Sequence, residues 1–186
     1  MSCTLILGGA RSGKSALAER LALESGKEVL YLATSRAGDG EMRARIAHHR
    51  ARRPAQWRTL EEPLLLAASL RSACRPGRIV LVDCLTLWLT NLMLCGVAEV
   101  PEDGKFTPPP EFEAQRTAFL DLLAQGLPGE LLLVSNEVGM GIVPMGALAR
   151  RFADEAGLLN QAVAARVQRV ILVAAGLPLV LKGAPC

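Results

Sequence analysis

Near its N-terminus the 186-residue chain carries Gly8-Gly9-Ala10-Arg11-Ser12-Gly13-Lys14-Ser15, which fits the phosphate-loop pattern G-x-x-x-x-G-K-[ST]. The preceding segment, Thr4–Leu7, is an apolar run of strand length that ends at a glycine. The following segment, Ser15–Leu23, has the leucine spacing and alanine content of a helix. A glycine-rich turn between a strand and a helix lets backbone N–H groups and the helix N-terminus surround a phosphate. The stretch therefore predicts a nucleoside triphosphate site; a glycine-rich turn without a ligand is the alternative.

Three side chains provide the charge and the oxygen ligands that such a site needs. Lys14 is expected to reach the β- and γ-phosphates, and the Ser15 hydroxyl is expected to ligate Mg²⁺. Ile79–Val82 is an apolar strand closed by Asp83, which is the Walker B pattern. We expect Asp83 to hold Mg²⁺ through water. An ordinary strand-end aspartate in a turn is the alternative interpretation.

Segments typical of strands and helices alternate along the whole chain. This alternation predicts βαβ units and a mostly parallel sheet whose ligands bind beyond the carboxyl ends of the strands. We expect one domain over residues 1–186 with an α/β fold of the P-loop NTPase (RecA-like) type, a three-layer sandwich of helices around the sheet. The expected strands are Thr4–Leu7, Glu28–Ala33, Ile79–Val82, Leu131–Ser135, Val170–Ala174 and Leu179–Leu181; the expected helices are Ser15–Leu23, Glu41–Arg53, Leu64–Ala73, Leu85–Leu94, Phe112–Ala124 and Gly146–Ala165.

The composition favours a globular α/β protein over a dedicated nucleic-acid binder or a membrane-spanning protein. Hydrophobic residues make up 51% of the chain and aromatic residues only 4%, which suits an aliphatic core around a parallel sheet. The net charge of +3 is a weaker basic excess than dedicated nucleic-acid binders show. The longest uncharged run, Cys84–Ala98, has 15 residues, whereas a membrane-spanning helix needs about 20 apolar ones. The five cysteines lack metal-ligand spacing, so we expect reduced thiols in a cytoplasmic protein.

The only two histidines, His48 and His49, are adjacent. At helical spacing His49 shares an apolar stripe with Ile46, whereas His48 shares a charged stripe with Arg45 and Arg52. A neutral imidazole beside guanidinium groups is a plausible nucleophile toward phosphorus, because those groups lower its pKa and neutralise a leaving pyrophosphate. From the pattern alone, a solvated basic helix with two incidental histidines is favoured.

Several further motifs accompany the phosphate loop. Together they resemble the bifunctional adenosylcobinamide kinase / adenosylcobinamide-phosphate guanylyltransferase family of cobalamin biosynthesis, from residue 5 to about residue 176. The phosphate loop, the histidine pair and the Asn136–Pro144 block are specific in combination. The other residues that carry the resemblance are Tyr31–Ser35, Glu41, Met42, Arg45, Ile46, Arg53, Pro54, Trp57–Thr59, Glu61, Asp83–Thr86, Thr90–Leu92, Leu148–Arg150, Phe152, Asp154, Gly157, Asn160 and Gln161.

The resemblance implies a two-step activity. ATP or GTP would phosphorylate the aminopropanol hydroxyl of adenosylcobinamide, and GMP from GTP would then be transferred to that phosphate through a GMP-histidine intermediate on His48. Mg²⁺ would accompany the nucleotides. The resemblance also implies a homo-oligomer, with trimers among its members. The small net charge and the few aromatic residues predict no nucleic-acid partner. The implied nucleotide contacts are Gly8, Gly9, Ala10, Arg11, Ser12, Gly13, Lys14, Ser15, Thr34, Ser35, Arg36, His49, Arg50, Ala51, Arg52, Glu61 and Asp83, with Ser15 and Asp83 also implied as metal ligands.

Three questions remain open at this stage. Asn136 and Glu137 follow a strand and are expected near the γ-phosphate, where they would orient substrate or accept a proton; a turn and helix-capping role is the alternative. A P-loop kinase of another small metabolite would explain the phosphate loop and Asp83 but leave His48 idle. A P-loop ATPase or switch acting on nucleic acid or a protein would instead use the Arg43–Arg53 cluster as a basic patch.

Overall fold

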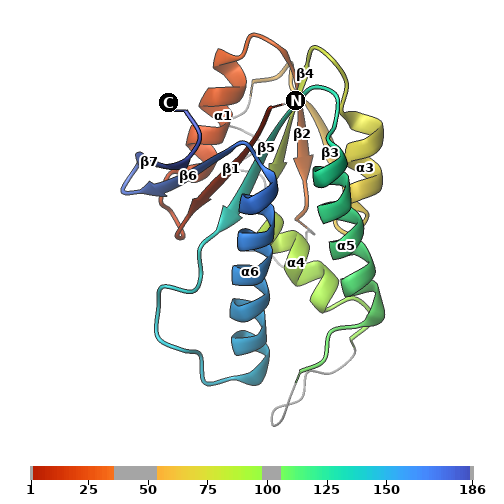
Figure 1. Cartoon of the computed structure of the whole chain (residues 1–186), viewed down its shortest axis with the longest axis vertical. Helices are drawn as coiled ribbons and strands as arrows, with labels where there is room; N and C mark the ends of the chain where they lie inside the picture. The colour runs from red at the N-terminus through yellow and green to blue at the C-terminus, as the bar shows by residue number, and fades with distance from the viewer. Residues whose placement is uncertain (1, 36–53, 98–105, 185–186) are drawn as a thin grey trace.

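The computed structural model describes residues 2–35, 54–97 and 106–184. The strands and helices alternate through most of the chain, as the sequence predicts (Figure 1). The strands are β1 (Ser2–Gly8), β2 (Glu28–Ala33), β3 (Arg58–Glu61), β4 (Arg78–Asp83), β5 (Glu130–Asn136), β6 (Arg169–Ala174) and β7 (Leu177–Lys182). The helices are α1 (Lys14–Glu24), α3 (Leu66–Ala73), α4 (Leu85–Met93), α5 (Pro110–Gln125) and α6 (Ala147–Arg166).

The strands form one seven-stranded sheet in the order β3-β2-β4-β5-β1-β6-β7. Every neighbouring pair is parallel except β6 and β7, which form an antiparallel pair at one edge. The strand β1, which leads into the phosphate loop, lies between β5 and β6. The strand β4, which ends at Asp83, is therefore separated from β1 by β5 alone.

Alternate residues of each central strand face opposite layers of helices, because side chains along a strand have a period of two. In β1, Leu5 and Leu7 pack with the core formed by α3, α4, α5 and α6, whereas Ile6 packs with the core formed by α1. Trp88 and Phe119 meet edge-on in the larger core, with ring centroids 5.1 Å apart. The chain thus builds the predicted three layers.

The predicted elements that fall within the described ranges are present within a few residues of their expected ends. One strand was missed: β3 pairs with β2 at the edge of the sheet, but apart from Leu60 its residues are charged or polar and exposed. Such a short edge strand carries no apolar alternation that a sequence could reveal. The predicted helix Glu41–Arg53 lies outside the described residues, as do residues 98–105.

The parallel strands end at the lower edge of the sheet in Figure 1, where β1 leads into the phosphate loop and β5 into the connection to α6. The register places Ala33 beside both Glu61 and Asp83, and Gly8 beside Asn136. Residues predicted for chemistry from four separate strands therefore meet along one edge, as expected for a parallel α/β sheet. Within the described ranges, no helix is long and apolar enough to cross a bilayer.

Candidate nucleotide-binding site

The phosphate loop has a backbone that only glycine permits at two positions. A Cβ on Gly8 would lie 2.4 Å from Ser12 Oγ and 2.6 Å from the Val173 carbonyl oxygen. Gly13, which precedes α1, has a φ of 97°, in the left-handed region that side chains disfavour. The N–H of Gly176, in the turn between β6 and β7, donates to the Ser12 carbonyl at 2.8 Å. The loop is therefore held in one shape by its neighbours.

This shape leaves groups that suit a phosphate. The N-terminus of α1 has no side-chain cap and no acidic residue in its first turn, so its N–H groups and positive dipole end are open to an anion. Ser12 Oγ is buried and has no hydrogen-bond partner within the described part of the chain. A buried hydroxyl without a partner is costly, and a phosphate oxygen would supply that partner. The residues present fit a nucleotide phosphate.

Lys14 and Asp83 lie close enough to influence each other electrostatically. Lys14 is buried, and its Nζ donates to the Gly9 carbonyl oxygen at 3.0 Å. Burial lowers the pKa of Lys14, while the neighbouring Cys84 and Asp83 oppose that shift. The Tyr31 hydroxyl donates to Asp83 Oδ2 at 2.8 Å and so orients the carboxylate. The Walker A lysine and Walker B aspartate are thus brought together, although β5 separates their strands.

The oxygen donors also fit Mg²⁺. Ser15 lies in the first turn of α1 and is half-buried, and Asp83 is half-buried at the end of β4. In triphosphate sites Mg²⁺ takes one or two protein oxygens and completes its shell with phosphate and water. Within the described ranges no three His, Cys, Asp or Glu side chains gather as a protein-only metal cage. Ser15 and Asp83 are therefore suited to hold the ion with a nucleotide present.

Thr34 braces the strand end that carries Asp83. It is fully buried, and its hydroxyl donates to the Cys84 carbonyl at 2.7 Å and accepts from the Cys84 N–H at 2.9 Å. Asn91 of α4 donates to the Thr34 carbonyl at 2.7 Å. Burial raises the pKa of the Cys84 thiol to about 12, so it stays protonated beside the site. The predicted nucleotide contact at Thr34 remains a prediction, and the structure gives this residue a bracing role.

A buried polar network ties the end of β5 to two helices. Ser135 Oγ donates to Asn160 Oδ1 of α6 at 2.8 Å and lies 3.4 Å from the Thr86 hydroxyl of α4. Thr86 Oγ1 accepts the Asn136 N–H at 2.7 Å, and Asn160 Nδ2 donates to the Asn136 carbonyl at 3.1 Å. No role for Thr86, Ser135 or Asn160 follows from the sequence pattern. In the sequence, each of these three polar residues lies in an otherwise apolar segment, which is the one mark that could have indicated a buried network.

Glu137 joins the end of β5 to the phosphate loop. Its N–H donates to the Gly8 carbonyl oxygen at 3.0 Å. Its Oε1 accepts the Gly139 N–H at 2.7 Å, so the carboxylate stabilises the turn that follows. The turn interpretation thus has direct support in the geometry. The expected position of Glu137 near the γ-phosphate stays a prediction; the structure places its backbone beside Gly8.

The predicted site residues divide into two groups. Gly8–Ser15, Thr34, Ser35, Glu61 and Asp83 lie at the carboxyl edge of the sheet. The others lie outside the described residues, so the structure says nothing of them. They are Arg36, His48, His49, Arg50, Ala51 and Arg52.

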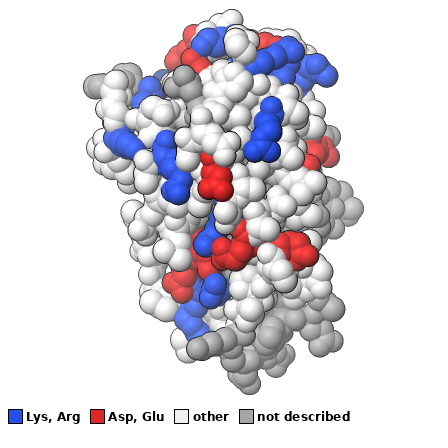
Figure 2. Space-filling model, turned by 45° about the vertical axis from the view of Figure 1, so that its right-hand side comes forward, with Lys and Arg blue, Asp and Glu red and all other residues white. Residues whose placement is uncertain are grey.

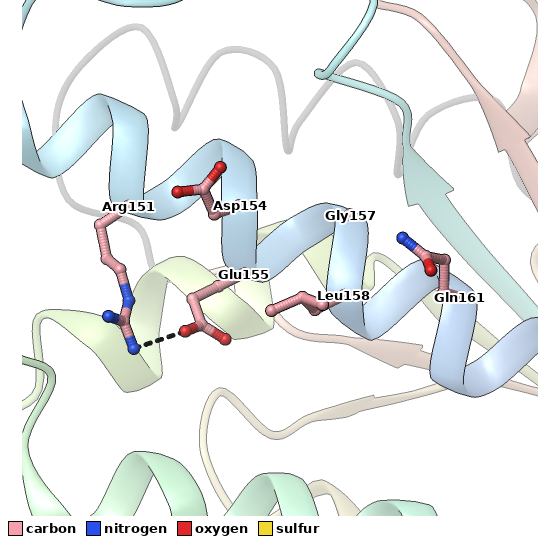
Figure 3. Close-up of a pocket in the computed structure, with 6 residues that line it drawn as sticks. All are labelled: Arg151, Asp154, Glu155, Gly157, Leu158 and Gln161. Carbon is pink, nitrogen blue, oxygen red and sulfur yellow. Dashed lines mark ion pairs between the residues drawn. The ribbon is translucent and has the colours of Figure 1, made fainter.

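A separate hollow of about 600 Å³ lies along α6 (Figure 3). Arg151 points toward Glu155 in this hollow, and their charged groups are 2.6 Å apart. Glu155 also accepts from Arg116 of α5 at 2.8 Å. Glu155 is thus paired with two arginines, and the hollow contains none of the predicted site residues. Basic and acidic side chains are also interspersed over the described part of the face in Figure 2, unlike a nucleic-acid surface.

Residues 4–181 match the family described as cobinamide kinase / cobinamide phosphate guanyltransferase. The chain belongs to this family. It is 61% identical over 181 residues to the bifunctional adenosylcobalamin biosynthesis protein CobP of Pseudomonas aeruginosa, covering 97% of this chain and 98% of that protein. It is 42% identical to the corresponding CobU protein of Escherichia coli K12, covering 96% and 98% of the two chains. The resemblance found in the sequence is confirmed.

Solved structures place this cobinamide kinase / guanyltransferase family member in a wider fold. A type III secretion system ATPase of pathogenic bacteria superposes with a TM-score of 0.55 at 14% identity, over 96% of this chain and 56% of that one. The ATPase EscN of enteropathogenic E. coli gives a TM-score of 0.54 at 14% identity, over 94% and 43%. At this identity the likeness concerns the fold alone. The predicted RecA-like P-loop NTPase fold is confirmed.

Proposed function

We propose that this protein phosphorylates adenosylcobinamide with ATP or GTP and then transfers GMP from GTP to that phosphate, giving adenosylcobinamide-GDP and pyrophosphate. The observation that carries the proposal is the family match over residues 4–181 on a chain with a fully formed phosphate loop. Relatives that this chain matches over nearly their whole length are named bifunctional adenosylcobalamin biosynthesis proteins.

In the kinase step, the aminopropanol hydroxyl releases its proton to solvent and its oxygen attacks the γ-phosphorus. The bond from that phosphorus to the β-phosphate oxygen breaks, and a nucleoside diphosphate leaves. Gly8–Ser15 bind the phosphates through backbone N–H groups, and Lys14 balances the charge that develops on the leaving oxygen. Ser15 and Asp83 would hold Mg²⁺, which supplies further charge neutralisation when bound. Asp83 is oriented for this by Tyr31.

In the transfer step, an imidazole nitrogen of His48 attacks the α-phosphorus of GTP and pyrophosphate leaves. An oxygen of the cobinamide phosphate then attacks the same phosphorus, and the phosphorus–nitrogen bond breaks. We assign His48 this role from the family resemblance. We assign guanine nucleotide contacts to Thr34, Ser35, Arg36, His49, Arg50, Ala51, Arg52 and Glu61 on the same basis.

We also infer that residues 1–186 act as one domain and that the protein works in the cytoplasm as a homo-oligomer, for which a trimer is one candidate state. A corrinoid is too large for the cleft of a small monomer to enclose comfortably, so a neighbouring subunit would help to complete the site. Measuring the mass in solution by light scattering tests the assembly; a monomer at working concentration would contradict it.

A product assay tests the proposed function. The protein is incubated with cobinamide, Mg²⁺ and GTP, and the corrinoid products are separated and weighed by mass spectrometry. We expect cobinamide phosphate followed by cobinamide-GDP. Asp83→Asn should abolish most of both products, whereas Asp121→Asn, an exposed carboxylate on α5, should leave them unchanged.

Two results would contradict this function in different ways. If cobinamide were only phosphorylated, the protein would be a kinase without guanylyltransferase activity. If a folded protein that binds GTP left cobinamide unchanged, it would be a P-loop enzyme for another substrate.

A further inference from the structure

The connection between β5 and α6 exposes an unusual set of apolar side chains. Met140, Ile142, Val143 and Met145 are 79%, 97%, 72% and 93% exposed. Val138, at the start of the connection, is 38% exposed. We call residues 138–145 the apolar loop. Figure 1 shows it as the cyan connection that bows away from the helices at the lower left. A cluster of exposed apolar side chains of this kind marks an interaction site.

The apolar loop is fixed at both ends. Its beginning is fixed by the Glu137 N–H, which donates to the Gly8 carbonyl oxygen of the phosphate loop at 3.0 Å. Its end is fixed by Arg150 of α6, whose guanidinium donates to the Pro144 carbonyl at 3.1 Å and to the Met145 carbonyl. The loop therefore exposes its apolar side chains while its two ends are held, one at the phosphate loop and the other at α6.

The apolar loop follows β5, the strand that pairs with β1 beside the phosphate loop. In phosphoryl transfer the attacking oxygen approaches the γ-phosphorus in line with the leaving oxygen, from the side opposite the β-phosphate. The phosphate loop follows β1, and the ends of β5 and β4 come next along the same edge of the sheet. We therefore infer that the acceptor side is bordered by the ends of β4 and β5. The apolar loop begins directly at the end of β5.

An apolar surface at this place fits one substrate of the proposed function. A nucleotide presents phosphates, a ribose and a polar base edge. The four exposed aliphatic and thioether side chains carry no charge and no strong hydrogen-bonding group with which to bind them. A corrinoid presents the broad face of a largely apolar macrocycle with amide groups around its rim. Methionine adapts to irregular apolar surfaces because its side chain is flexible and polarisable.

We propose that the apolar loop is the docking surface for the corrin ring of the acceptor and positions its aminopropanol arm toward the phosphate loop. This inference rests on the proposed function. Ile142 and Met145 are the principal contacts because they are the most exposed of the set. Binding of the ring there also removes water from beside the γ-phosphate, which strengthens the electrostatic interactions of the site.

The test compares wild type with the double variant Ile142→Ser/Met145→Ser. Because both side chains are almost fully exposed, their replacement leaves the folded core intact. Cobinamide binding is measured by equilibrium dialysis through its own visible absorbance, and GTP binding is measured separately. Leu23→Ser is the matched control, because Leu23 is 50% exposed at the opposite end of α1.

We expect the double variant to raise the Kd for cobinamide about tenfold or more and leave the Kd for GTP within about twofold. Its KM for cobinamide should rise while kcat changes little, and Leu23→Ser should match wild type. An unchanged Kd for cobinamide would overturn the inference. The inference would also be overturned if the loss of cobinamide binding accompanied dissociation of the assembly in light scattering. The loop would then be a contact surface for a second copy of the chain. If wild type itself neither bound nor phosphorylated cobinamide, the proposed function would fail too.

Discussion

Two glycine-rich loops leave neighbouring strands at the same edge of the sheet, and they are built in opposite ways. The phosphate loop after β1 is braced by Gly176 and Lys14, and it turns its backbone toward the ligand. The apolar loop after β5 is held at its ends and presents side chains outward. The difference teaches that phosphate recognition in this fold depends on backbone geometry, whereas the acceptor recognition that we propose depends on exposed side chains.

The largest expected effect comes from removing the one side chain on which the phosphate loop depends. Lys14→Ala should lower kcat/KM for the kinase step by about 100-fold or more, because the charge that opposes the developing phosphate charge is lost. The variant should still fold, because the hydrogen bond that the Lys14 side chain loses runs only to Gly9 of the same loop. Steady-state kinetics with circular dichroism as the folding control measure this. Near-wild-type activity would show that the phosphate loop is not the catalytic site.

A pair of glycine substitutions tests the contrast between the loops directly. Gly8→Ala should destabilise the protein by about 2–3 kcal/mol, because its Cβ would meet Ser12 and the Val173 carbonyl. Gly141→Ala should leave stability nearly unchanged, because no atom lies within 4 Å of the added Cβ. Urea unfolding of both variants measures the free energies. Equal costs would mean that the two loops are equally constrained.

The network behind β5 should have an intermediate effect. Ser135→Ala removes the donor to Asn160 and leaves a buried amide oxygen less satisfied, which should cost about 1–2 kcal/mol. Thermal unfolding should then show a Tm lower by about 2–6 °C. Ser72→Ala, an exposed hydroxyl on α3, is the control. A Tm equal to that of the control would show that the network does not hold the end of β5.

The smallest effect on stability is expected at Glu28, which lies at the amino-terminal end of β2, away from the strand ends that carry both loops. Hydrogen bonds from Arg78 and Arg75 lower the pKa of Glu28 from 4.5 to about 2. This pairing stabilises the fold above pH 4.5, and the contribution is lost as the pH falls toward 2. Glu28→Gln should lower Tm slightly at pH 7. Between pH 4.5 and 2, the Tm of the variant should decrease less steeply than that of wild type. GTP affinity should not change; a steeper acid dependence in the variant would contradict the assignment.

The sequence predicted the phosphate loop, Asp83 and most strands because each leaves a local mark: a spacing, a terminal acid or an apolar run. It missed β3, whose pairing depends on a neighbour supplied by the fold rather than on its own apolar residues. It also gave Thr34 only a ligand role, whereas the fold uses its hydroxyl to hold Cys84.

The network of Thr86, Ser135 and Asn160 shows the same limit. Three polar residues about 25 to 75 positions apart become partners only when α4, β5 and α6 pack together. The exposed side chains of the apolar loop were likewise hidden, because an apolar run in a sequence ordinarily predicts burial. These contacts and exposures therefore depend on long-range packing, which a local sequence pattern does not reveal.

The most direct test of the central claim, that one P-loop protein both phosphorylates and guanylylates, is a labelling experiment. The protein is incubated with Mg²⁺ and GTP labelled at either the α- or the γ-phosphate, and the protein is then isolated. We predict an acid-labile adduct from the α label alone, lost in His48→Ala and retained in His49→Ala. No adduct on a folded wild-type protein that binds GTP would contradict the account.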